Sequence, residues 1–403
     1  MFYPAHINLQ DRKCLVVGGG TVAERKVVAM LLSGGDVTVI SPDATELLTF
    51  LANIGTIRWQ KRQLKSGDTD GYFLVCAATD FTDINSAVFA EAHDKNKIRL
   101  VNVVDVIPQC TFAAASVVTD GEILLSISTS GKSPATSRRI REYLEETLHA
   151  TSLYTLGYED DEPVEIKNQG LPYPVYLLLE NRRCVVLCAQ KTSEIERRIS
   201  LLDRCGASVV CMAPDEMEPH HLEDAFLVIA DKFSAVDRLL STTLPNPPYQ
   251  GGINKRRSKG IFIREYLDAP DAGTHFTPDL VIDNNLIISV SARSSTGIDD
   301  AKRLHKELTN QFENNGYGAF IEFLGSRRAE ILKAFSTPKK RADFFERLID
   351  TVETKNAQPQ TCCLGLTNPE CSAECLFNWV RQGKLARANA FASKLLDKAD
   401  RCC

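Results

Sequence analysis

The sequence contains two segments that carry the same short motifs in the same order, one in each half of the chain. Tyr3-Pro4 precedes the apolar run Cys14–Val17, and Tyr173-Pro174 precedes the run Cys184–Leu187. Further along, VTVISPD is matched by SVVCMAPD, and GEILLSISTS by NLIISVSARS, with Ser128 aligned to Ser291. Because the matches keep one order, we interpret the chain as an internal duplication whose second copy has diverged.

Each copy alternates short β-branched runs with helical patterns. The runs LVV, VTVI, FLVCAA and LVNVV are typical of buried parallel strands, and VAERKVVAMLLSGG and INSAVFAEAHDKNK are typical of the helices between them. This alternation predicts an α/β fold with a Rossmann-like doubly wound parallel sheet, present twice with a degenerate second copy. We also expect α+β dimerisation-type segments after each sheet and a C-terminal helical region.

The composition excludes several classes of protein. A net charge of −5 argues against a nucleic-acid partner, since phosphate recognition needs a basic surface. No apolar run approaches the roughly 20 residues of a membrane-spanning helix. The N-terminus shows no secretory signal, so we expect a cytoplasmic protein with reduced cysteines.

A glycine-rich loop follows the first strand and leads into a helix. Gly18, Gly20 and Ala23 fit the pattern G-x-G-x-x-[GA] in its strand–turn–helix context. The first glycine permits a tight turn, the second lets the backbone approach a pyrophosphate, and the alanine allows close helix packing. A structural turn alone is the alternative, which the context disfavours. The helix N-terminus would offer N–H groups to the phosphates.

Two further positions refine this prediction. Asp43 follows the second strand, where an acid commonly accepts the ribose hydroxyls, although an Asp after Pro42 is also ordinary turn chemistry. No Lys or Arg stands at this strand end, which favours NAD over NADP. In the second copy Cys188, Ala189 and Gln190 replace the three glycines, so we expect no dinucleotide there.

Four motifs in order carry a resemblance to a known family: GGGTVAERK, CAATD, NVVD and ISTSGKSPATSRRIRE. Residues 1–148 resemble precorrin-2 dehydrogenases, often also sirohydrochlorin ferrochelatases, which form the NAD-dependent module of sirohaem synthases. The resemblance implies NAD-dependent oxidation of precorrin-2 to sirohydrochlorin, with Fe²⁺ insertion as an activity of some members. We assign to the NAD site Gly18, Gly20, Thr21, Val22, Ala23, Asp43, Ala78, Thr79 and Asp80. Nothing in residues 151–403 resembles the methyltransferase domain of the trifunctional enzymes.

The resemblance also implies roles in catalysis and substrate binding. A carboxylate at the position of Asp105 is implicated in hydride removal and metal insertion, where a positioned base helps a proton to leave. The alternative is an Asp that caps the turn before Pro108. The substrate carries eight carboxylates, and its expected partners are Ser128, Ser130, Lys132, Arg138 and Arg141. The alternative is a solvated helix face balanced by Glu142, Glu145 and Glu146. One departure from the family is His6, where an apolar residue is usual.

These considerations divide the chain into seven predicted segments. They are an NAD-binding domain (1–105), a dimerisation and tetrapyrrole-binding segment (106–150), a linker (151–170), a degenerate Rossmann-like domain (171–265), a second dimerisation-type segment (266–318), a helical region (319–355) and a Cys-rich tail (356–403). Family members are dimers, so the resemblance implies an intramolecular pseudo-dimer and leaves a homodimer of whole chains open.

The tail and the degenerate copy leave alternatives open. Cys362, Cys363, Cys371 and Cys375 match no common zinc or ferredoxin spacing, yet four thiols so close together in the sequence are candidates for an iron–sulfur cluster or for iron capture. Redox-labile thiols are the other interpretation. The rival function is a non-catalytic tetrapyrrole or haem carrier or sensor, against which the intact GGGTVAERK argues.

Overall fold

The computed structural model describes the chain in two compact units. The described residues are 1–104, 106–148, 151–152, 157–159, 161–218, 220–234, 263–292, 297–335, 337–351, 364–366 and 374–400. One unit combines Met1–Ala114 with Ser152–Pro278, and the other combines Ala115–Thr151 with Asp279–Cys403. Each unit therefore takes one segment from each half of the chain. The seven predicted segments are a finer division, and their boundaries remain predictions.

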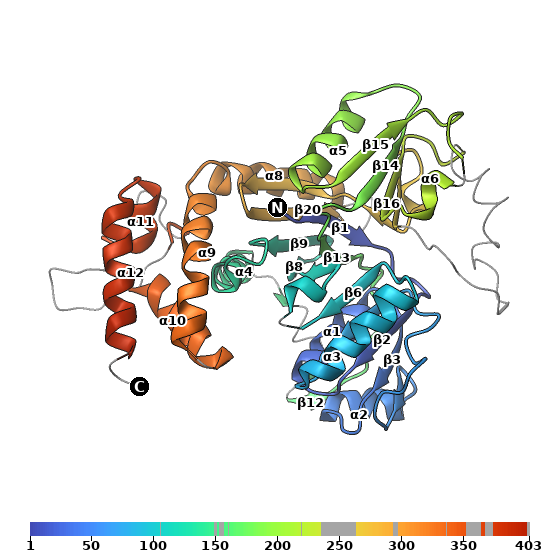
Figure 1. Cartoon of the computed structure of the whole chain (residues 1–403), viewed down its shortest axis with the longest axis horizontal. Coiled ribbons are helices and arrows are strands. Elements are labelled where there is room, and N and C mark those ends of the chain that lie inside the picture. The colour runs from blue at the N-terminus through green and yellow to red at the C-terminus, as the bar shows by residue number, and fades with distance from the viewer. Residues whose placement is uncertain are drawn as a thin grey trace. The chain divides into compact units, whose positions relative to one another are not determined.

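The first module of the first unit is a parallel sheet with helices (Figure 1). Its strands lie in the order β4-β3-β2-β5-β6. They are β2 (Lys13–Val17), β3 (Asp36–Ile40), β4 (Arg58–Gln60), β5 (Leu74–Ala77) and β6 (Leu100–Val103). The helices are α1 (Thr21–Leu32), α2 (Glu46–Asn53) and α3 (Thr82–Phe89), which a π-helical turn extends over Ala90–Lys95. The β-branched runs are buried on both faces, as parallel strands between helices must be.

The second module repeats this arrangement. Its parallel strands lie in the order β15-β14-β16-β17, which is the order β3-β2-β5-β6 of the first module. The elements are β14 (Arg183–Leu187), α5 (Ser193–Arg204), β15 (Ser208–Met212), α6 (His220–Glu223), β16 (Leu227–Ala230) and β17 (Ile263–Tyr266). The predicted fold class, with two doubly wound parallel sheets, is confirmed.

A small antiparallel sheet joins the two modules. Strands β1 (Tyr3–Ile7) and β13 (Tyr173–Leu177) pair with Ala5 opposite Val175. Val175 lies as far from Ala5 in the sequence as Tyr173 lies from Tyr3, so Ala5 and Val175 are equivalent residues of the two halves. Because these equivalent residues pair with each other, they lie on a local pseudo-two-fold axis. The outer strands are β18 (His275–Phe276) beside β1 and β7 (Phe112–Ala114) beside β13. Equivalent strands of the two halves therefore pair with each other.

The sheet of the second unit shows the same local symmetry. Its order is β10-β8-β9-β20-β19, and β9 (Ile123–Ser128) pairs antiparallel with β20 (Leu286–Ala292). Ser126 lies opposite Ser289, and their buried hydroxyls are 2.6 Å apart. These serines are 163 positions apart, as are Ser128 and Ser291 of the aligned motifs. The other strands are β8 (Ser116–Asp120), β10 (Thr151–Ser152) and β19 (Asp279–Asp283).

Helices cover this second sheet and share one apolar core with it. The core includes Phe320, Leu324 and Trp379. The helices are α4 (Pro134–Thr147), α8 (Ile298–Phe312), α9 (Tyr317–Ala334), α10 (Pro338–Asp350), α11 (Leu376–Arg381) and α12 (Leu385–Asp400). The expected C-terminal helical region is thus present.

The remaining elements are short. The hairpin of β11 (Tyr158–Glu159) and β12 (Glu162–Pro163) lies in the predicted linker, and 3₁₀ turns span Ile107–Gln109 and Pro270–Ala272. None of the helices among the described residues combines the length and the apolar character needed to cross a membrane.

Candidate functional site

The glycine loop of the first module leaves room for a ligand at the N-terminus of α1. Gly18 has φ +122°, and a Cβ there would lie 2.2 Å from the carbonyl oxygen of Ala78. A Cβ on Gly19 would lie 2.0 Å from the carbonyl oxygen of Asp43, whereas a Cβ on Gly20 would meet nothing within 4 Å. No side chain caps α1 at Gly20. The loop therefore combines open space with helix N–H groups, which is what a bound pyrophosphate needs.

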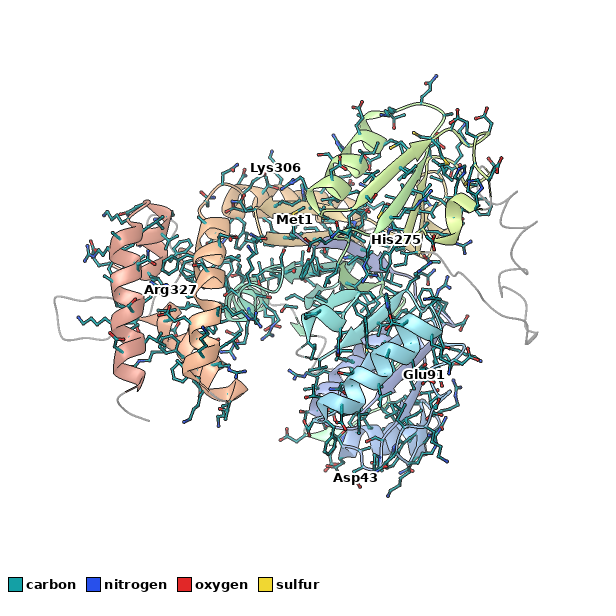
Figure 2. All side chains as sticks on the ribbon, viewed as in Figure 1. Met1, Asp43, Glu91, His275, Lys306 and Arg327 are labelled. Carbon is teal, nitrogen blue, oxygen red and sulfur yellow. The ribbon has the colours of Figure 1, made fainter. Side chains whose placement is uncertain are left out.

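The predicted cofactor residues come from three loops that the structure brings to one edge of the sheet. The loop after β5 touches Gly18 through Ala78, and the loop after β3 touches Gly19 through Asp43. The amide of Thr45 also donates to the carbonyl of Gly19 at 2.9 Å. Among the predicted residues, Ala23 is buried, Val22, Ala78 and Thr79 are half-buried, and Thr21, Asp43 and Asp80 are exposed. Figure 2 shows Asp43 at the periphery of this module.

Helix α1 is tied to the strand that leads to the predicted base. The Lys26 ammonium donates to Asn102 Oδ1 at 2.7 Å, and Asn102 Nδ2 donates to the carbonyl oxygen of Phe112 at 2.9 Å. Burial raises the pKa of the neighbouring Cys110 thiol, which is therefore a neutral partner in this cluster. Asp105 itself lies outside the described residues. Sequence reasoning missed the Lys26–Asn102 pair, although both residues stand in quoted motifs.

The corresponding loop of the second module is already occupied by the chain's own polar groups. Cys188 is buried, and the amide of Ala189 donates to Asp231 Oδ2 at 3.0 Å. The Thr192 hydroxyl caps α5 by accepting from the amide of Ile195 at 3.3 Å. Asp231 directly follows β16, in the place that Ala78 takes after β5. A carboxylate thus bonds a loop amide that corresponds to Gly19, which supports the expected loss of dinucleotide binding.

Comparisons with known proteins agree with this geometry. Residues 5–116 match the family model described as "Putative NAD(P)-binding". We call this part of the chain the NAD(P)-binding module, after the family that it matches. The chain is 37% identical over 150 residues to Siroheme synthase 1 of Serratia proteamaculans, covering 37% of this chain and 31% of that protein. It is 40% identical over 156 residues to Siroheme synthase of Photorhabdus laumondii, covering 39% and 33%.

The resemblance of this part of the chain to sirohaem synthases is therefore confirmed. The chain spans about a third of the length of these curated relatives. A solved structure of SirC, a precorrin-2 dehydrogenase, is 29% identical over 35% of this chain and 68% of its own, with a TM-score of 0.32.

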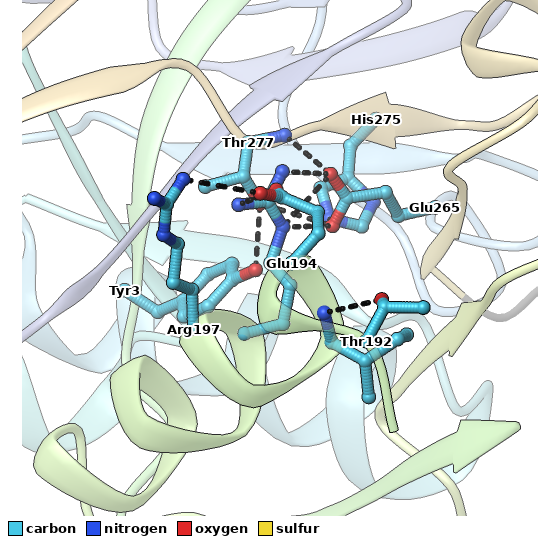
Figure 3. A network of polar contacts seen from close by, with 9 residues as sticks. Tyr3, Thr192, Glu194, Arg197, Glu265, His275 and Thr277 are labelled. Atoms are coloured by element: carbon cyan, nitrogen blue, oxygen red, sulfur yellow. Dashed lines mark hydrogen bonds and ion pairs between the residues drawn. The ribbon is translucent and has the colours of Figure 1, made fainter. Parts of the chain in front are cut away.

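A buried ion pair in the second module occupies the position of the Lys26–Asn102 pair of the NAD(P)-binding module (Figure 3). Arg198 Nη2 lies 3.1 Å from Glu265 Oε1, and the amide of Thr277 donates to the same oxygen at 2.9 Å. Tyr3 of β1 belongs to the same cluster, and its hydroxyl lies 2.7 Å from Thr277 Oγ1. Burial alone would raise the pKa of Glu265, but His275 and Arg198 outweigh it and lower that pKa. The second module therefore has a buried ion pair where the first has an ammonium–amide hydrogen bond.

The predicted substrate-binding residues all belong to the second unit. Ser128 and Ser130 are buried, and the amide of Ser130 donates to the Ser128 hydroxyl at 3.1 Å. Lys132 forms an ion pair with Glu322 of α9. Arg138 Nη2 lies 2.6 Å from Glu346 Oε1 of α10, and Arg141 Nη1 lies 2.6 Å from Glu145 Oε1. Each cation thus already has a carboxylate partner.

The structure describes only one of the four predicted metal ligands. Cys362, Cys363 and Cys371 lie outside the described residues, whereas Cys375 is buried directly before α11. Within the part of the chain that the structure describes, no three His, Cys, Asp or Glu side chains form a group suited to a metal ion.

Proposed function

We propose that this protein is an NAD-dependent precorrin-2 dehydrogenase that forms sirohydrochlorin in the biosynthesis of sirohaem. The observation that carries the proposal is the open glycine loop at the edge of an NAD(P)-binding module whose sequence matches sirohaem synthases. A cytoplasmic location, as expected from the sequence, is part of the proposal. The activity of the whole chain stands as a proposal because the match covers about a third of each relative.

Three loops hold the cofactor in this account. The amides of the Gly18–Thr21 loop and the N-terminus of α1 bind the pyrophosphate, and Asp43 accepts the ribose hydroxyls. A carboxylate at Asp43 repels a 2′-phosphate, so NAD is preferred to NADP. Ala78, Thr79 and Asp80 close the site from the β5 side. Bound NAD⁺ supplies the hydride acceptor.

The chain's own chemical task is then to remove a proton. Precorrin-2 loses two hydrogens on oxidation, one as a hydride and one as a proton, and we assign the proton to the Asp105 carboxylate by resemblance to the family. The Lys26–Asn102 bond fixes β6, which precedes Asp105 in the sequence, to the helix proposed to bind the cofactor. This pair is a positioning element.

The tetrapyrrole carboxylates are assigned to Ser128, Ser130, Lys132, Arg138 and Arg141. Since the three cations already pair with glutamates, substrate binding has to exchange one carboxylate partner for another. Such an exchange costs little for exposed pairs, whose net contribution is about 0–1 kcal/mol. Arg138, which is half-exposed, fits this role better than Arg141.

Three further assignments belong to the proposal. Insertion of Fe²⁺ into sirohydrochlorin, with iron as a substrate, is a second activity that the resemblance implies. The tail cysteines are assigned to iron, as a cluster or as a capture site. The internal duplication makes the chain an intramolecular pseudo-dimer with one dinucleotide site, and a homodimer of whole chains stays open.

The experiment that tests the proposal is anaerobic incubation of precorrin-2 with NAD⁺ and either wild type or Asp105→Asn. We expect the variant to bind NAD⁺ normally and to lose at least about 100-fold in kcat, the usual contribution of a positioned general base. Asp83→Asn is the matched control, since Asp83 is an exposed acid of the same module. A fully active Asp105→Asn refutes the assignment of the base.

The rival function is a non-catalytic tetrapyrrole carrier or sensor. The filled loop of the second module favours it only for that module. A wild-type protein that binds the tetrapyrrole but neither binds NAD⁺ nor forms NADH would establish the rival.

A further inference from the structure

The order of the strands defines where a ligand lies on the NAD(P)-binding module. From β2 the chain proceeds to β3 and β4 on one side, and then crosses to β5 and β6 on the other. The direction of winding therefore reverses between β2 and β5, and ligands of such sheets bind in the crevice outside the strand ends at this point. The loops on its two sides are the glycine loop after β2 and residues 78–81 after β5.

Phe81 is an exposed aromatic residue at this crevice. Its side chain is 63% exposed, the largest value among the exposed large apolar side chains in the described ranges. A single exposed apolar residue is common on protein surfaces and by itself indicates nothing. The distinguishing feature of Phe81 is its position, three residues after Ala78, whose carbonyl oxygen abuts Gly18.

The backbone that carries Phe81 is held firmly. The amide of Phe81 donates to the Thr79 hydroxyl at 3.2 Å, and Asn85 Nδ2 donates to the carbonyl oxygen of Thr79 at 2.8 Å. The amide of Asn85 in turn donates to the carbonyl oxygen of Phe81 at 3.0 Å, which starts α3. The ring is thus presented on an ordered turn, so little backbone entropy remains to be lost when a ligand stacks on it.

We propose that Phe81 stacks on a flat ring of the bound dinucleotide, either the adenine or the nicotinamide. The inference rests on the proposed function, because it requires NAD at this crevice. An aromatic side chain that stacks on a base typically contributes about 1–3 kcal/mol, so its removal weakens binding by about 5- to 150-fold.

The test is calorimetric titration of the full-length wild type, Phe81→Ala and Phe81→Trp with NAD⁺ and with ADP-ribose, which lacks the nicotinamide. We expect Phe81→Ala to weaken NAD⁺ binding about tenfold and Phe81→Trp to restore it. A parallel loss for ADP-ribose identifies the adenine as the stacked ring, and a loss confined to NAD⁺ identifies the nicotinamide.

Ile54→Ala is the matched control, since Ile54 is also exposed, at 46%, and directly follows α2 of the same module. It is expected to bind NAD⁺ like the wild type. Unchanged NAD⁺ affinity in Phe81→Ala, including the case in which only tetrapyrrole binding weakens, would overturn the inference. A wild type that fails to bind NAD⁺ would instead overturn the proposed function itself, so the two failures are distinguishable.

Discussion

An aspartate placed in the first module at the position that Asp231 takes in the second is predicted to weaken binding of the cofactor. Asp231 follows β16 and accepts the Ala189 amide at 3.0 Å, and Ala78 is the corresponding residue after β5. In Ala78→Asp, the new carboxylate would therefore accept a hydrogen bond from an amide of the glycine loop, where the pyrophosphate has to bind. Two unit charges about 4 Å apart repel by about 4 kcal/mol at an effective dielectric constant of about 20.

Because residue 78 is half-exposed, solvent screening reduces this repulsion to about 2 kcal/mol, which is roughly a 30-fold increase in Kd. The assay is titration with NADH at low and high salt, and the effect should shrink at high salt. Ala78→Asn is the control of similar size without the charge, expected to bind within a few-fold of the wild type. Wild-type affinity in Ala78→Asp, or an equal loss in Ala78→Asn, would refute the electrostatic reasoning.

Three other predictions follow from the first unit. Glu265→Gln removes the buried carboxylate that pairs with Arg198 and leaves it only the more exposed Glu194, so the free energy of unfolding should fall by about 3 kcal/mol in denaturant titrations. Exposed Glu196→Gln should change it by less than about 0.5 kcal/mol. Burial and the nearby His275 lower the pKa of His6 to about 3, so below about pH 6.5 the imidazole binds a proton in the unfolded state while it stays neutral in the folded state. The free energy of unfolding therefore falls as the pH drops below about 6.5. At about pH 5 the loss is about 2 kcal/mol, and His6→Leu should lack this component; an equal slope in both proteins argues against it. Calorimetry should find one NAD⁺ per chain, and two sites would contradict the occupied loop of the second module.

The local parts of the fold were predictable from the sequence because they depend on neighbours along the chain. Short β-branched runs alternating with helices established the α/β class, and the glycines after β2 predicted the strand–turn–helix arrangement that the structure contains. The replacement of those glycines in the second copy predicts a loop without a dinucleotide. It gave no sign of the bond from the Ala189 amide to Asp231, which lies at a strand end 42 positions further along the chain.

Contacts between distant segments were not predictable in the same way. The pairing of Ala5 with Val175 and of Ser126 with Ser289 depends on register between strands from opposite halves of the chain. The cations of the predicted substrate site illustrate the same limit, since Glu346, the partner of Arg138, comes from α10, which lies beyond the whole second module in the sequence. The sequence placed Arg138 and Arg141 on one helix together with Glu145, the partner of Arg141, but carried no sign of the two distant acids that pair with Arg138 and Lys132.

The most direct test of the central claim is the anaerobic reaction of precorrin-2 and NAD⁺ with the full-length wild type, followed by absorbance. We expect precorrin-2 to disappear only when NAD⁺ is present, and NADH and sirohydrochlorin to appear in equal amounts. Formation of sirohydrochlorin without NADH, or no reaction by a protein that binds both compounds, would contradict it.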